Sequence, residues 1–273
     1  MIQWSILNKR NRAVEYLFGL ARALCLPQSP PSATRTFVMS SGGKINNERD
    51  MSEVNDWQAW RSADAVCFDV DSTVIREEGL DGLAEYLQKG EDVRTITMQA
   101  MGGKLSFREA LAKRLEIIQP TLSQMEEFSS KRAFSLTPGV QELITKLQTK
   151  QVPVYLISGG FLRLILPVAK SLGIPESNVF CNKVIFDDEG RYANFDPSAY
   201  TADTGGKGRV IADLIEQNSY KNVAMIGDGA TDMEASPPAH MFIGFGGNVC
   251  RPAVREAAKL FVMSFDVLSE ALG

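Results

Sequence analysis

Three apolar runs, each followed by polar residues and then by a helical pattern, mark the chain at positions 65–68, 152–157 and 223–226. Short continuous apolar runs are typical of strands that are buried on both faces of a parallel sheet. Because each run precedes a helical pattern, the sequence predicts an α/β fold with a doubly wound, mostly parallel, Rossmann-like sheet.

The ends of these predicted strands carry the residues that suggest chemistry. In chain order they are Asp69-Val70-Asp71-Ser72-Thr73, Ser158-Gly159-Gly160 and Gly227-Asp228-Gly229-Ala230-Thr231-Asp232. Open α/β sheets bind ligands outside the carboxyl ends of their strands, so we expect the three stretches to meet in one site. By itself, an Asp-x-Asp pair is more often a polar exit from a strand without chemistry. The hydroxyl beside two glycines and the second acid pair favour a phosphoryl-transfer site instead.

A lysine motif, Thr204-Gly205-Gly206-Lys207-Gly208, lies between the second and third stretches. Apolar residues at helical spacing follow it, which predicts that Lys207 lies at the start of a helix. A lysine after two glycines is usually part of a solvated turn. Here its place in the order of motifs indicates that its ammonium reaches the site, where it would neutralise phosphate oxygens and restrain Asp69.

A long insertion separates the first two predicted strands. The interval from Asp69 to Ser158 far exceeds the roughly 30 residues that a strand-helix-strand unit needs. Within the interval, apolar residues at helical spacing predict helices near 80–87, 110–118 and 121–132. The insertion therefore resembles a small helical subdomain that covers the site.

Local signals give the limits of this insertion. Two pairs of residues are typical of capping boxes at helix starts: Ser106 with Glu109, and Thr121 with Gln124. At Thr137-Pro138 a new helix is expected to begin with proline in its first position. We therefore expect a helical cap subdomain at 78–134 and a core domain made of 61–77 and 135–273.

A β-hairpin is predicted between the serine and lysine motifs. Residues 183–186 and 191–195 alternate in polarity around Asp188-Glu189-Gly190, which is a turn sequence. The hairpin is expected to extend the sheet.

Taken in order, with a helical insertion after the first, these motifs resemble the four signature motifs of the haloacid dehalogenase superfamily. Within it, the flanking stretches resemble the phosphoserine phosphatase family; they are 74–79, 100–103, 157–161 and 226–235. The resemblance covers the chain from about Ala63 to its end. It implies hydrolysis of O-phospho-L-serine to L-serine and phosphate, the last step of serine biosynthesis.

The resemblance also implies the catalytic residues. Asp69 would attack phosphorus and carry the phosphoryl group as an aspartyl phosphate, which divides one hydrolysis into two displacements. Asp71 would protonate the leaving serine oxygen and then deprotonate water. Relatives that use the phosphoenzyme to drive transport have threonine at the second position, so aspartate at 71 favours release of free phosphate.

One Mg²⁺ per site is implied as the cofactor, because a carboxylate that approaches a phosphate dianion meets strong repulsion. The family pattern places Asp69, the backbone carbonyl of Asp71 and Asp228 on the ion, with Asp232 near it through water. The chain has one histidine, His240, and no C-x-x-C pair, which argues against zinc. His240 is expected to be structural.

Substrate recognition is implied for both the core and the insertion. The expected substrate-binding residues are Glu78, Met101, Gly102, Arg114, Ser158, Gly159, Gly160, Lys207 and Thr231. Glu78 would bind the substrate amine, and Arg114 its carboxylate, for which a planar guanidinium is well suited. Taken separately, each of these two is more simply a surface charge.

Composition agrees with a cytoplasmic enzyme and argues against a nucleic-acid partner, in keeping with the small-molecule substrate that the resemblance implies. The net charge of −4 and the pI near 5.3 lack the basic footprint of nucleic-acid-binding proteins. The four cysteines show no disulfide-like spacing, which favours reduced thiols; they are Cys25, Cys67, Cys181 and Cys250.

The first 60 residues are expected to form an N-terminal extension. Residues 1–50 contain seven Lys or Arg against three acids, and an arginine-containing amphipathic stretch precedes a proline-rich segment at 27–32. This pattern is compatible with a mitochondrial presequence and equally with a disordered extension. Glu15 and Arg22 interrupt the apolar residues around them, so no membrane span is expected.

Three other functions fit parts of the pattern. A dinucleotide-binding module would explain Gly227-Asp228-Gly229, but Asp232 replaces the third glycine of that fingerprint and would repel a pyrophosphate. A phosphate-accepting signalling domain needs neither Asp71 nor the insertion. Another small-molecule phosphatase or phosphotransferase on the same fold stays open. Because the family often forms dimers, a homodimer is also implied.

Overall fold

The structure, a computed structural model, describes residues 48–101, 105–131 and 134–273, with the backbone alone at 48–53 and Met101. Residues 53–273 form a compact unit that contains the sheet and the site. The sequence predictions for residues 1–47 and for Gly102 lie outside the described residues.

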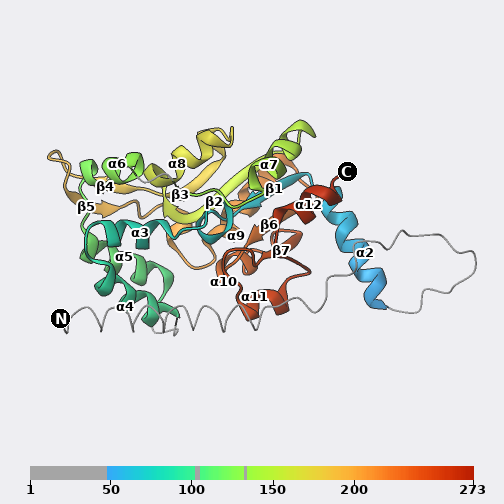
Figure 1. The fold of residues 1–273 in the computed structure, drawn as a ribbon, viewed down its shortest axis with the longest axis horizontal. Coiled ribbons are helices and arrows are strands. Elements are labelled where there is room, and N and C mark those ends of the chain that lie inside the picture. Colours follow the sequence, from blue (N-terminus) through green and yellow to red (C-terminus); the bar gives the residue numbers. More distant parts are fainter. Residues whose placement is uncertain (1–47, 102–104, 132–133) are drawn as a thin grey trace, which may run out of the picture. The chain divides into compact units, whose positions relative to one another are not determined.

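Strands and helices alternate along most of the chain (Figure 1). The strands are β1 (Ala65–Phe68), β2 (Val154–Phe161), β3 (Val179–Asn182), β4 (Val184–Phe186), β5 (Tyr192–Phe195), β6 (Val223–Gly227), β7 (Met241–Phe245) and β8 (Leu260–Val262). The α-helices are α2 (Glu48–Arg61), α3 (Gly79–Tyr86), α4 (Gly90–Met101), α5 (Phe107–Ile118), α6 (Leu122–Lys131), α7 (Val140–Thr149), α8 (Leu162–Ser171), α9 (Gly206–Asn218), α10 (Ala230–Met233), α11 (Pro252–Ala257) and α12 (Phe265–Ala271). Shorter helical turns are η1 (Val70–Val74), η2 (Glu176–Asn178) and η3 (Tyr200–Ala202).

The main sheet has six strands in the order β3-β2-β1-β6-β7-β8, and every neighbouring pair is parallel. The chain builds outward from β1 in one direction and then returns to build outward from β6 in the other. Such a reversal is the point at which open α/β sheets bind ligands. The predicted fold class is confirmed, and β1 and β6 lie side by side at the reversal.

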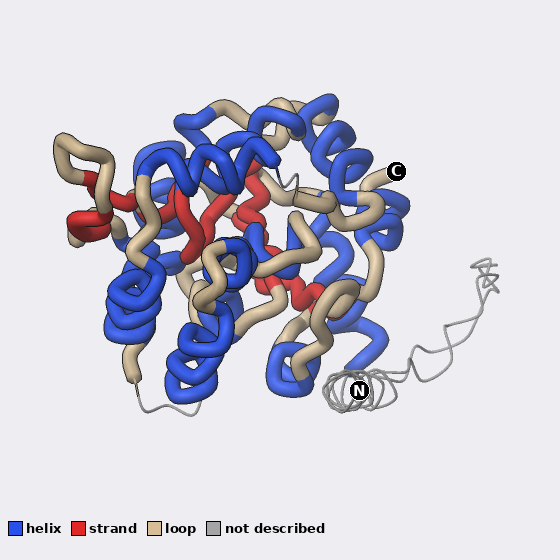
Figure 2. Tube along the Cα trace, turned by 60° about the vertical axis from the view of Figure 1, so that its left-hand side comes forward, coloured by secondary structure: helices blue, strands red, loops and turns tan. Residues whose placement is uncertain are grey.

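Buried side chains cover both faces of the sheet. In β1, Val66 and Phe68 belong to one apolar cluster, whereas Ala65 and Cys67 belong to the other. Helices α2, α7, α8 and α12 contribute to the first cluster, and α9 and α11 to the second. Figure 2 shows helices on both sides of the strands. The continuous apolar runs of the sequence are explained by this burial on two faces.

Helix α2 was not predicted, because its sequence is polar and has no apolar stripe. It packs on the core through tryptophan side chains. Trp60 is fully buried, and its indole Nε1 donates to the Leu268 carbonyl of α12 at 3.0 Å. Trp57 packs against the same cluster, and Arg61 Nε donates to the Ala271 carbonyl at 2.9 Å. Burial of two indole rings supplies the apolar area that the rest of the helix lacks.

Helices α3 to α6 form a helical insert between η1 and α7, and a third apolar cluster joins them to Phe161 of β2, Leu164 of α8 and Phe195 of β5. Leu83, Leu111, Leu115, Met125 and Phe128 lie at its centre. In Figure 1 these helices lie together with the β4-β5 hairpin, away from β7 and α12. The helical insert expected from the sequence is thus present.

Both predicted capping boxes are confirmed. Ser106 caps α5 with Glu109, and the Thr121 amide donates to Gln124 Oε1 at 2.9 Å while the Gln124 amide donates back to the threonine hydroxyl. Helix α4 was not predicted. Val93 is the one buried apolar residue among the described side chains of this helix, so its sequence has no periodic apolar pattern.

Two crossing segments, 74–76 and 135–137, join the core to the helical insert and run antiparallel to each other. Their hydrogen bonds run from the Arg76 amide to the Ser135 carbonyl (3.0 Å) and from the Thr137 amide to the Val74 carbonyl (2.9 Å). The sequence predicts a helix that begins at Pro138, but α7 begins at Val140, behind Gly139 with φ of 80°. The reason is that Thr137 is held in the crossing segment, so the chain needs a turn before it can enter the helix.

The hairpin at β4 and β5 is confirmed as an antiparallel pair. It forms a separate two-stranded sheet, so the expectation that it extends the main sheet is wrong. The main sheet is extended at that edge by β3, which pairs with β2 in parallel.

The cysteines differ from one another. Cys67 and Cys181 are free thiols, as expected, whereas Cys250 is disulfide-bonded, so the expectation of a reduced thiol is wrong there. Spacing along the sequence does not report which cysteines approach each other in a fold. Among the described residues, no helix is both long and apolar enough to span a membrane.

Candidate active site

The chain turns sharply where β1 ends. Asp69 is followed by the helical turn η1 (Val70–Val74), in which Ser72 has a φ of 55°, an uncommon value for a residue with a side chain. Two contacts hold this conformation: the Ser72 amide donates to the Glu77 carbonyl at 3.2 Å, and Asn248 Nδ2 donates to the Ser72 carbonyl at 3.1 Å. The turn brings residues that would alternate in a strand to one side.

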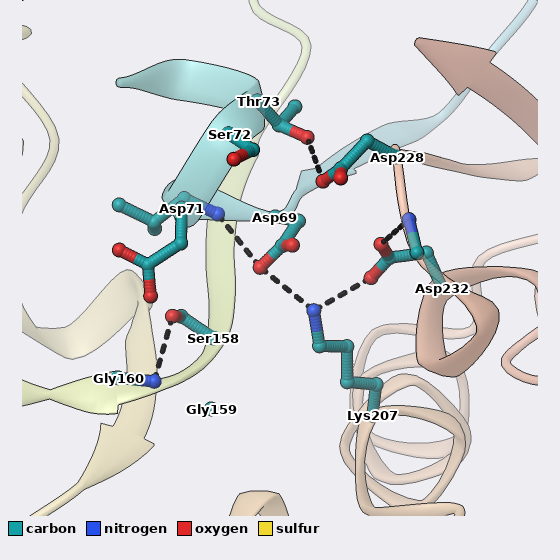
Figure 3. Close-up of polar contacts among 12 residues, drawn as sticks. Asp69, Asp71, Ser72, Thr73, Ser158, Gly159, Gly160, Lys207, Asp228 and Asp232 are labelled. Carbon is teal, nitrogen blue, oxygen red and sulfur yellow. Dashed lines mark hydrogen bonds and ion pairs between the residues drawn. The ribbon is translucent and has the colours of Figure 1, made fainter. Parts of the chain in front are cut away.

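Asp69 and Lys207 form a buried ion pair (Figure 3). Asp69 Oδ1 accepts a hydrogen bond from the Val70 amide at 2.8 Å and lies 2.7 Å from Lys207 Nζ. The same ammonium donates to Asp232 Oδ1 at 2.6 Å. Burial would lower the pKa of Lys207, but the charges of Asp232 and Asp69 outweigh it and raise that pKa above its usual range. Lys207 lies in the first turn of α9, as the sequence predicts.

The loop after β6 supplies two more carboxylates. Asp228 Oδ1 accepts a hydrogen bond from the Thr73 hydroxyl at 3.1 Å, and Asp232 Oδ2 accepts one from the Gly229 amide at 2.9 Å. A Cβ at Gly227 would lie 2.2 Å from Asp232 Cγ, so only glycine fits at the end of this strand. Burial raises the pKa of Asp232 to about 7, and the charge of Asp69 adds to the shift.

Three buried carboxylates, Asp69, Asp228 and Asp232, have oxygens within 4.8 Å of one another. Hard divalent cations such as Mg²⁺ prefer oxygen ligands, so this donor set fits the metal implied by the sequence. The chain's one histidine lies elsewhere: His240 Nδ1 accepts a hydrogen bond from the Val223 amide at 3.0 Å. Its structural role agrees with the sequence interpretation.

Asp71 lies in the helical turn η1, two residues after Asp69. Its Oδ1 accepts a hydrogen bond from the Gly79 amide at 2.9 Å, and its Oδ2 would lie 3.2 Å from a Cβ at Gly160. The carboxyl therefore faces the glycine loop (Figure 3). Burial and the charges of Glu78 and Asp69 raise the pKa of Asp71 to about 8. A carboxyl that keeps its proton near neutral pH can act as a general acid.

The glycine loop is the irregular end of β2, where the pairing with β3 shifts register. Ser158 Oγ accepts a hydrogen bond from the Gly160 amide at 2.9 Å, and Asn182 Nδ2 donates to the Gly159 carbonyl at 2.8 Å. A Cβ at Gly159 would lie 2.7 Å from Phe107 Cζ of α5. The helical insert thus packs directly on the loop.

The expected selectivity residues lie at the edge of the helical insert. Glu78 accepts a hydrogen bond from the Ser72 hydroxyl at 2.8 Å, and burial raises its pKa. Arg114 Nε donates to the Ala110 carbonyl of its own helix at 3.3 Å. Burial lowers the pKa of Arg114, whereas the carboxylate of Asp81 opposes this shift. The guanidinium is thus held in an acidic environment.

A pocket of about 350 Å³ opens beside Glu78. Its lining is acidic and aromatic: Glu77, Glu78, Asp81, Gly82, Glu85, Phe128 and Phe134. Asp81 Oδ1 is buried and has no hydrogen-bond partner within the described part of the chain. Sequence reasoning did not identify Asp81, which resembles an ordinary first-turn acid of a helix.

Three further predicted residues have less structural context. Thr231 is partly buried in the first turn of α10, on the same loop as Asp228 and Asp232. Met101 is the last residue of α4 and is described by its backbone alone. Gly102 lies outside the described residues.

Two polar residues of the loop after β7 reach the site and were missed. Asn248 Nδ2 donates to Thr137 Oγ1 at 2.7 Å as well as to the Ser72 carbonyl in η1. Arg251 Nη2 lies 3.0 Å from Asp228 Oδ2 and 4.0 Å from Glu78 Oε1. The apolar run 241–245 could have identified them, because it predicts a further strand whose carboxyl end lies at the same edge of the sheet.

Residues 63–240 match the haloacid dehalogenase-like hydrolase family. This range contains η1, the helical insert, the glycine loop, Lys207 and the acidic loop, which is the loop after β6 that carries Asp228 and Asp232. The chain belongs to this family. A member from Rattus norvegicus, a phosphoserine phosphatase, is 52% identical over 204 residues, which cover 75% of this chain and 91% of that protein. The resemblance inferred from the motifs is thereby confirmed.

Two solved structures are similar to the fold of this chain. DsGPDH of Dunaliella salina has a TM-score of 0.70 at 36% identity, and the match covers 79% of this chain and 37% of that protein. A phospho-aspartyl intermediate analogue of phosphoserine phosphatase has a TM-score of 0.64 at 25% identity, covering 73% and 93%. Its family and its relatives indicate that the chain is a phosphoric monoester hydrolase.

Proposed function

We propose that the protein is a phosphoserine phosphatase that hydrolyses O-phospho-L-serine through an aspartyl phosphate on Asp69. One observation supports this most directly. A carboxylate paired with a buried lysine, Asp69 with Lys207, lies beside a carboxyl that retains its proton, Asp71. Two acids in different environments can take different roles, one as nucleophile and the other as proton donor.

In the first half-reaction, an oxygen of Asp69 attacks phosphorus and the bond from phosphorus to the serine oxygen breaks. Asp71 donates its proton to that oxygen, so neutral serine hydroxyl leaves. Lys207 and the loop of Ser158, Gly159 and Gly160 hold the phosphate oxygens, since amides and an ammonium suit an anion. Thr231, on the acidic loop, contacts the same oxygens.

In the second half-reaction, the Asp71 carboxylate takes a proton from water, and the water oxygen attacks phosphorus. The bond from phosphorus to Asp69 breaks, which restores the Asp69 carboxylate and releases inorganic phosphate. Asp71 is thereby protonated again. A general acid in one step serves as base in the other, and such proton transfer typically contributes about 10² to 10⁴-fold.

Asp69, Asp228 and the Asp71 carbonyl would hold one Mg²⁺, with Asp232 nearby through water. The ion would screen the repulsion between the Asp69 carboxylate and the phosphate dianion. The buried all-oxygen cluster supports this assignment.

Recognition of the amino acid is assigned to the helical insert. Glu78 would pair with the substrate ammonium and Arg114 with its carboxylate, while Met101 and Gly102 close over the bound molecule. Among the described residues the Arg114 guanidinium donates to the Ala110 carbonyl alone, and this supports the pairing, because a substrate carboxylate would supply acceptors for its remaining N–H groups. The proposed limits of this cap subdomain are 78–134, with a core at 61–77 and 135–273.

The direct test is phosphate release by the full chain from O-phospho-L-serine, phosphoethanolamine and sugar phosphates, with Mg²⁺ and after chelation. We expect kcat/KM for O-phospho-L-serine to exceed the others at least about tenfold and chelation to abolish turnover. Preference for a sugar phosphate would favour another small-molecule phosphatase or phosphotransferase on the same fold. Full activity after rigorous chelation would contradict the metal assignment.

The cellular setting is a separate proposal. We expect a cytoplasmic enzyme, with mitochondrial import through the basic residues of the proposed N-terminal extension, residues 1–60, as the alternative. The last residues of that extension belong to α2, which packs on the core through Trp60. A fluorescent protein fused behind residues 1–60 would distinguish these locations by microscopy. A homodimer is also proposed, and sedimentation equilibrium of the purified chain would test it.

A further inference from the structure

Arg251 lies between two parts of the site that belong to different elements. It is the residue before α11, and its side chain is 35% exposed. Its Nε and Nη2 lie 3.1 and 3.0 Å from the same atom, Asp228 Oδ2. Its Nη2 also lies 4.0 Å from Glu78 Oε1, at the entrance to the helical insert.

The other contacts of the two carboxylates explain why Arg251 matters. Asp228 Oδ1, the oxygen that does not face Arg251, accepts the Thr73 hydroxyl, and Glu78 Oε1, the oxygen that faces Arg251, accepts the Ser72 hydroxyl. With Arg251 in place, Asp228 is held from both oxygens and cannot rotate freely. A carboxylate oxygen has two lone pairs, so a hydrogen bond from the guanidinium leaves room for a cation.

Arg251 also stands between two negative charges. Glu78 and Asp228 repel each other, and the guanidinium attracts both. Without that guanidinium, the two carboxylates would turn apart, one away from the cation and the other away from the substrate ammonium.

We propose that Arg251 is a positioning residue that holds Asp228 for the divalent cation and Glu78 for the ammonium of the substrate. The inference rests on the proposed function and extends it, because it couples metal binding in the core to amine recognition at the helical insert. Groups that orient metal ligands commonly change metal affinity by about 10- to 100-fold when they are removed.

The first experiment measures metal binding without turnover. Mg²⁺ is titrated calorimetrically into metal-free protein carrying Arg251→Gln or Arg251→Lys. We expect the Kd for Mg²⁺ to rise about tenfold or more with glutamine and by less with lysine, which keeps the charge but not the planar pair of donors. An unchanged or lower Kd would overturn the proposal, since loss of a simply repulsive cation would tighten Mg²⁺ binding.

The second experiment compares two esters at saturating Mg²⁺: O-phospho-L-serine and 3-phosphonooxypropanoate, which has the carboxylate but no ammonium. In Arg251→Gln, KM for O-phospho-L-serine should rise at least about fivefold more than KM for the analogue. Equal increases in KM for both esters would overturn the proposal that Arg251 positions Glu78 for the substrate ammonium.

Arg255→Gln is the matched control. Arg255 lies in the short helix α11 that follows Arg251, and its side chain makes no hydrogen bond or ion pair with the described residues. It should leave Kd and KM unchanged. Circular dichroism verifies folding, and if the glutamine variant fails to fold, the lysine variant carries the test. Failure of the proposed function can be distinguished from failure of this inference. If only the proposed function is wrong, the wild-type protein would not hydrolyse O-phospho-L-serine, but Arg251→Gln would still raise the Kd for Mg²⁺.

Discussion

The sheet edge and the helical insert contribute to the site in opposite ways. At the sheet edge, Asp69, Lys207 and Asp232 are buried and bound to one another. At the helical insert, and among the residues that the structure describes, Asp81 has a buried oxygen without a hydrogen-bond partner and Arg114 donates to a carbonyl of its own helix alone. One region is complete before substrate arrives, and the other has hydrogen-bonding capacity left for it.

This contrast indicates how the work is divided. Groups that stabilise a transition state act best when they are fixed in advance, because no reorganisation is then needed during reaction. Groups that select a substrate can be completed by it, since a missing substrate group then leaves a buried polar atom unpaired. We therefore expect changes at the sheet edge to lower kcat and changes at the helical insert to raise KM.

The largest effect is expected for Asp69→Asn. Loss of the nucleophile should lower kcat by at least about 10³-fold and abolish the acid-stable phosphoenzyme. Labelled substrate, rapid quench and peptide mapping would measure both. Asp188→Asn, the same exchange at an exposed hairpin turn, should leave kcat unchanged. Label found on another residue would contradict the assignment of Asp69.

A smaller and more selective loss is expected for Asp71→Asn. The first half-reaction should slow by about 10² to 10⁴-fold for O-phospho-L-serine, because the serine alkoxide is a poor leaving group without a proton donor. The burst of p-nitrophenol from p-nitrophenyl phosphate should change far less, since that leaving group needs no proton. Equal losses for both substrates would show that Asp71 does not act as the acid.

The pH dependence follows from the same carboxyl. Burial and neighbouring acids raise the pKa of Asp71 to about 8, so it is protonated below that pH and ionised above it. The rate of serine release in a single turnover should therefore fall as pH rises through this range, and a bound cation would move the fall to lower pH. In Asp71→Asn the slow rate should be flat with pH. A rate that rises across the range would contradict the assignment.

At the helical insert, Arg114→Ala should raise KM for O-phospho-L-serine by roughly 10- to 100-fold, as expected for loss of a charged hydrogen bond. KM for phosphoethanolamine, which lacks the carboxylate, should change little. Lys113→Ala, the neighbouring exposed residue of α5, is the control. Similar increases for the two substrates would show that Arg114 does not bind the carboxylate.

The smallest effect is expected where the two regions touch away from the site. Arg108 of α5 pairs with Asp203, its Nη2 lying 2.9 Å from Asp203 Oδ2, and also donates to the Pro197 carbonyl at 3.1 Å. Both charged side chains are 34% exposed, so Arg108→Ala should lower the free energy of unfolding by no more than about 1 kcal/mol. A double-mutant cycle with Asp203→Asn would measure the coupling by urea denaturation. A coupling well above that value would show that the pair fixes the insert to the core.

Much of the sheet edge could be predicted from sequence because its signals are local. An apolar run that ends in Asp69, in Ser158 or in Asp228 combines a strand signal with a chemical one, and parallel strands place their carboxyl ends together. Arg251 and Asn248 escaped because the strand before them ends in glycines, with no acid or hydroxyl to mark it. Their importance depends on pairings across the sheet that no local pattern contains.

The helical insert was harder to read for a different reason. Helices with apolar stripes, such as α5, could be placed from periodicity and their capping boxes. Helix α4 buries little more than Val93, so its helix has no periodic signature. Likewise, the importance of the Asp81 carboxylate follows from its burial. That burial depends on how separate helices pack and could not be predicted from local sequence.

The antiparallel pairing of 74–76 with 135–137 has an evolutionary consequence. The chain enters and leaves the insert through two adjacent, paired segments. A lineage could therefore replace the residues between them with a longer, shorter or differently shaped structure without displacing the strands of the main sheet. New specificities could then arise by replacing a module while the inherited chemistry stays intact.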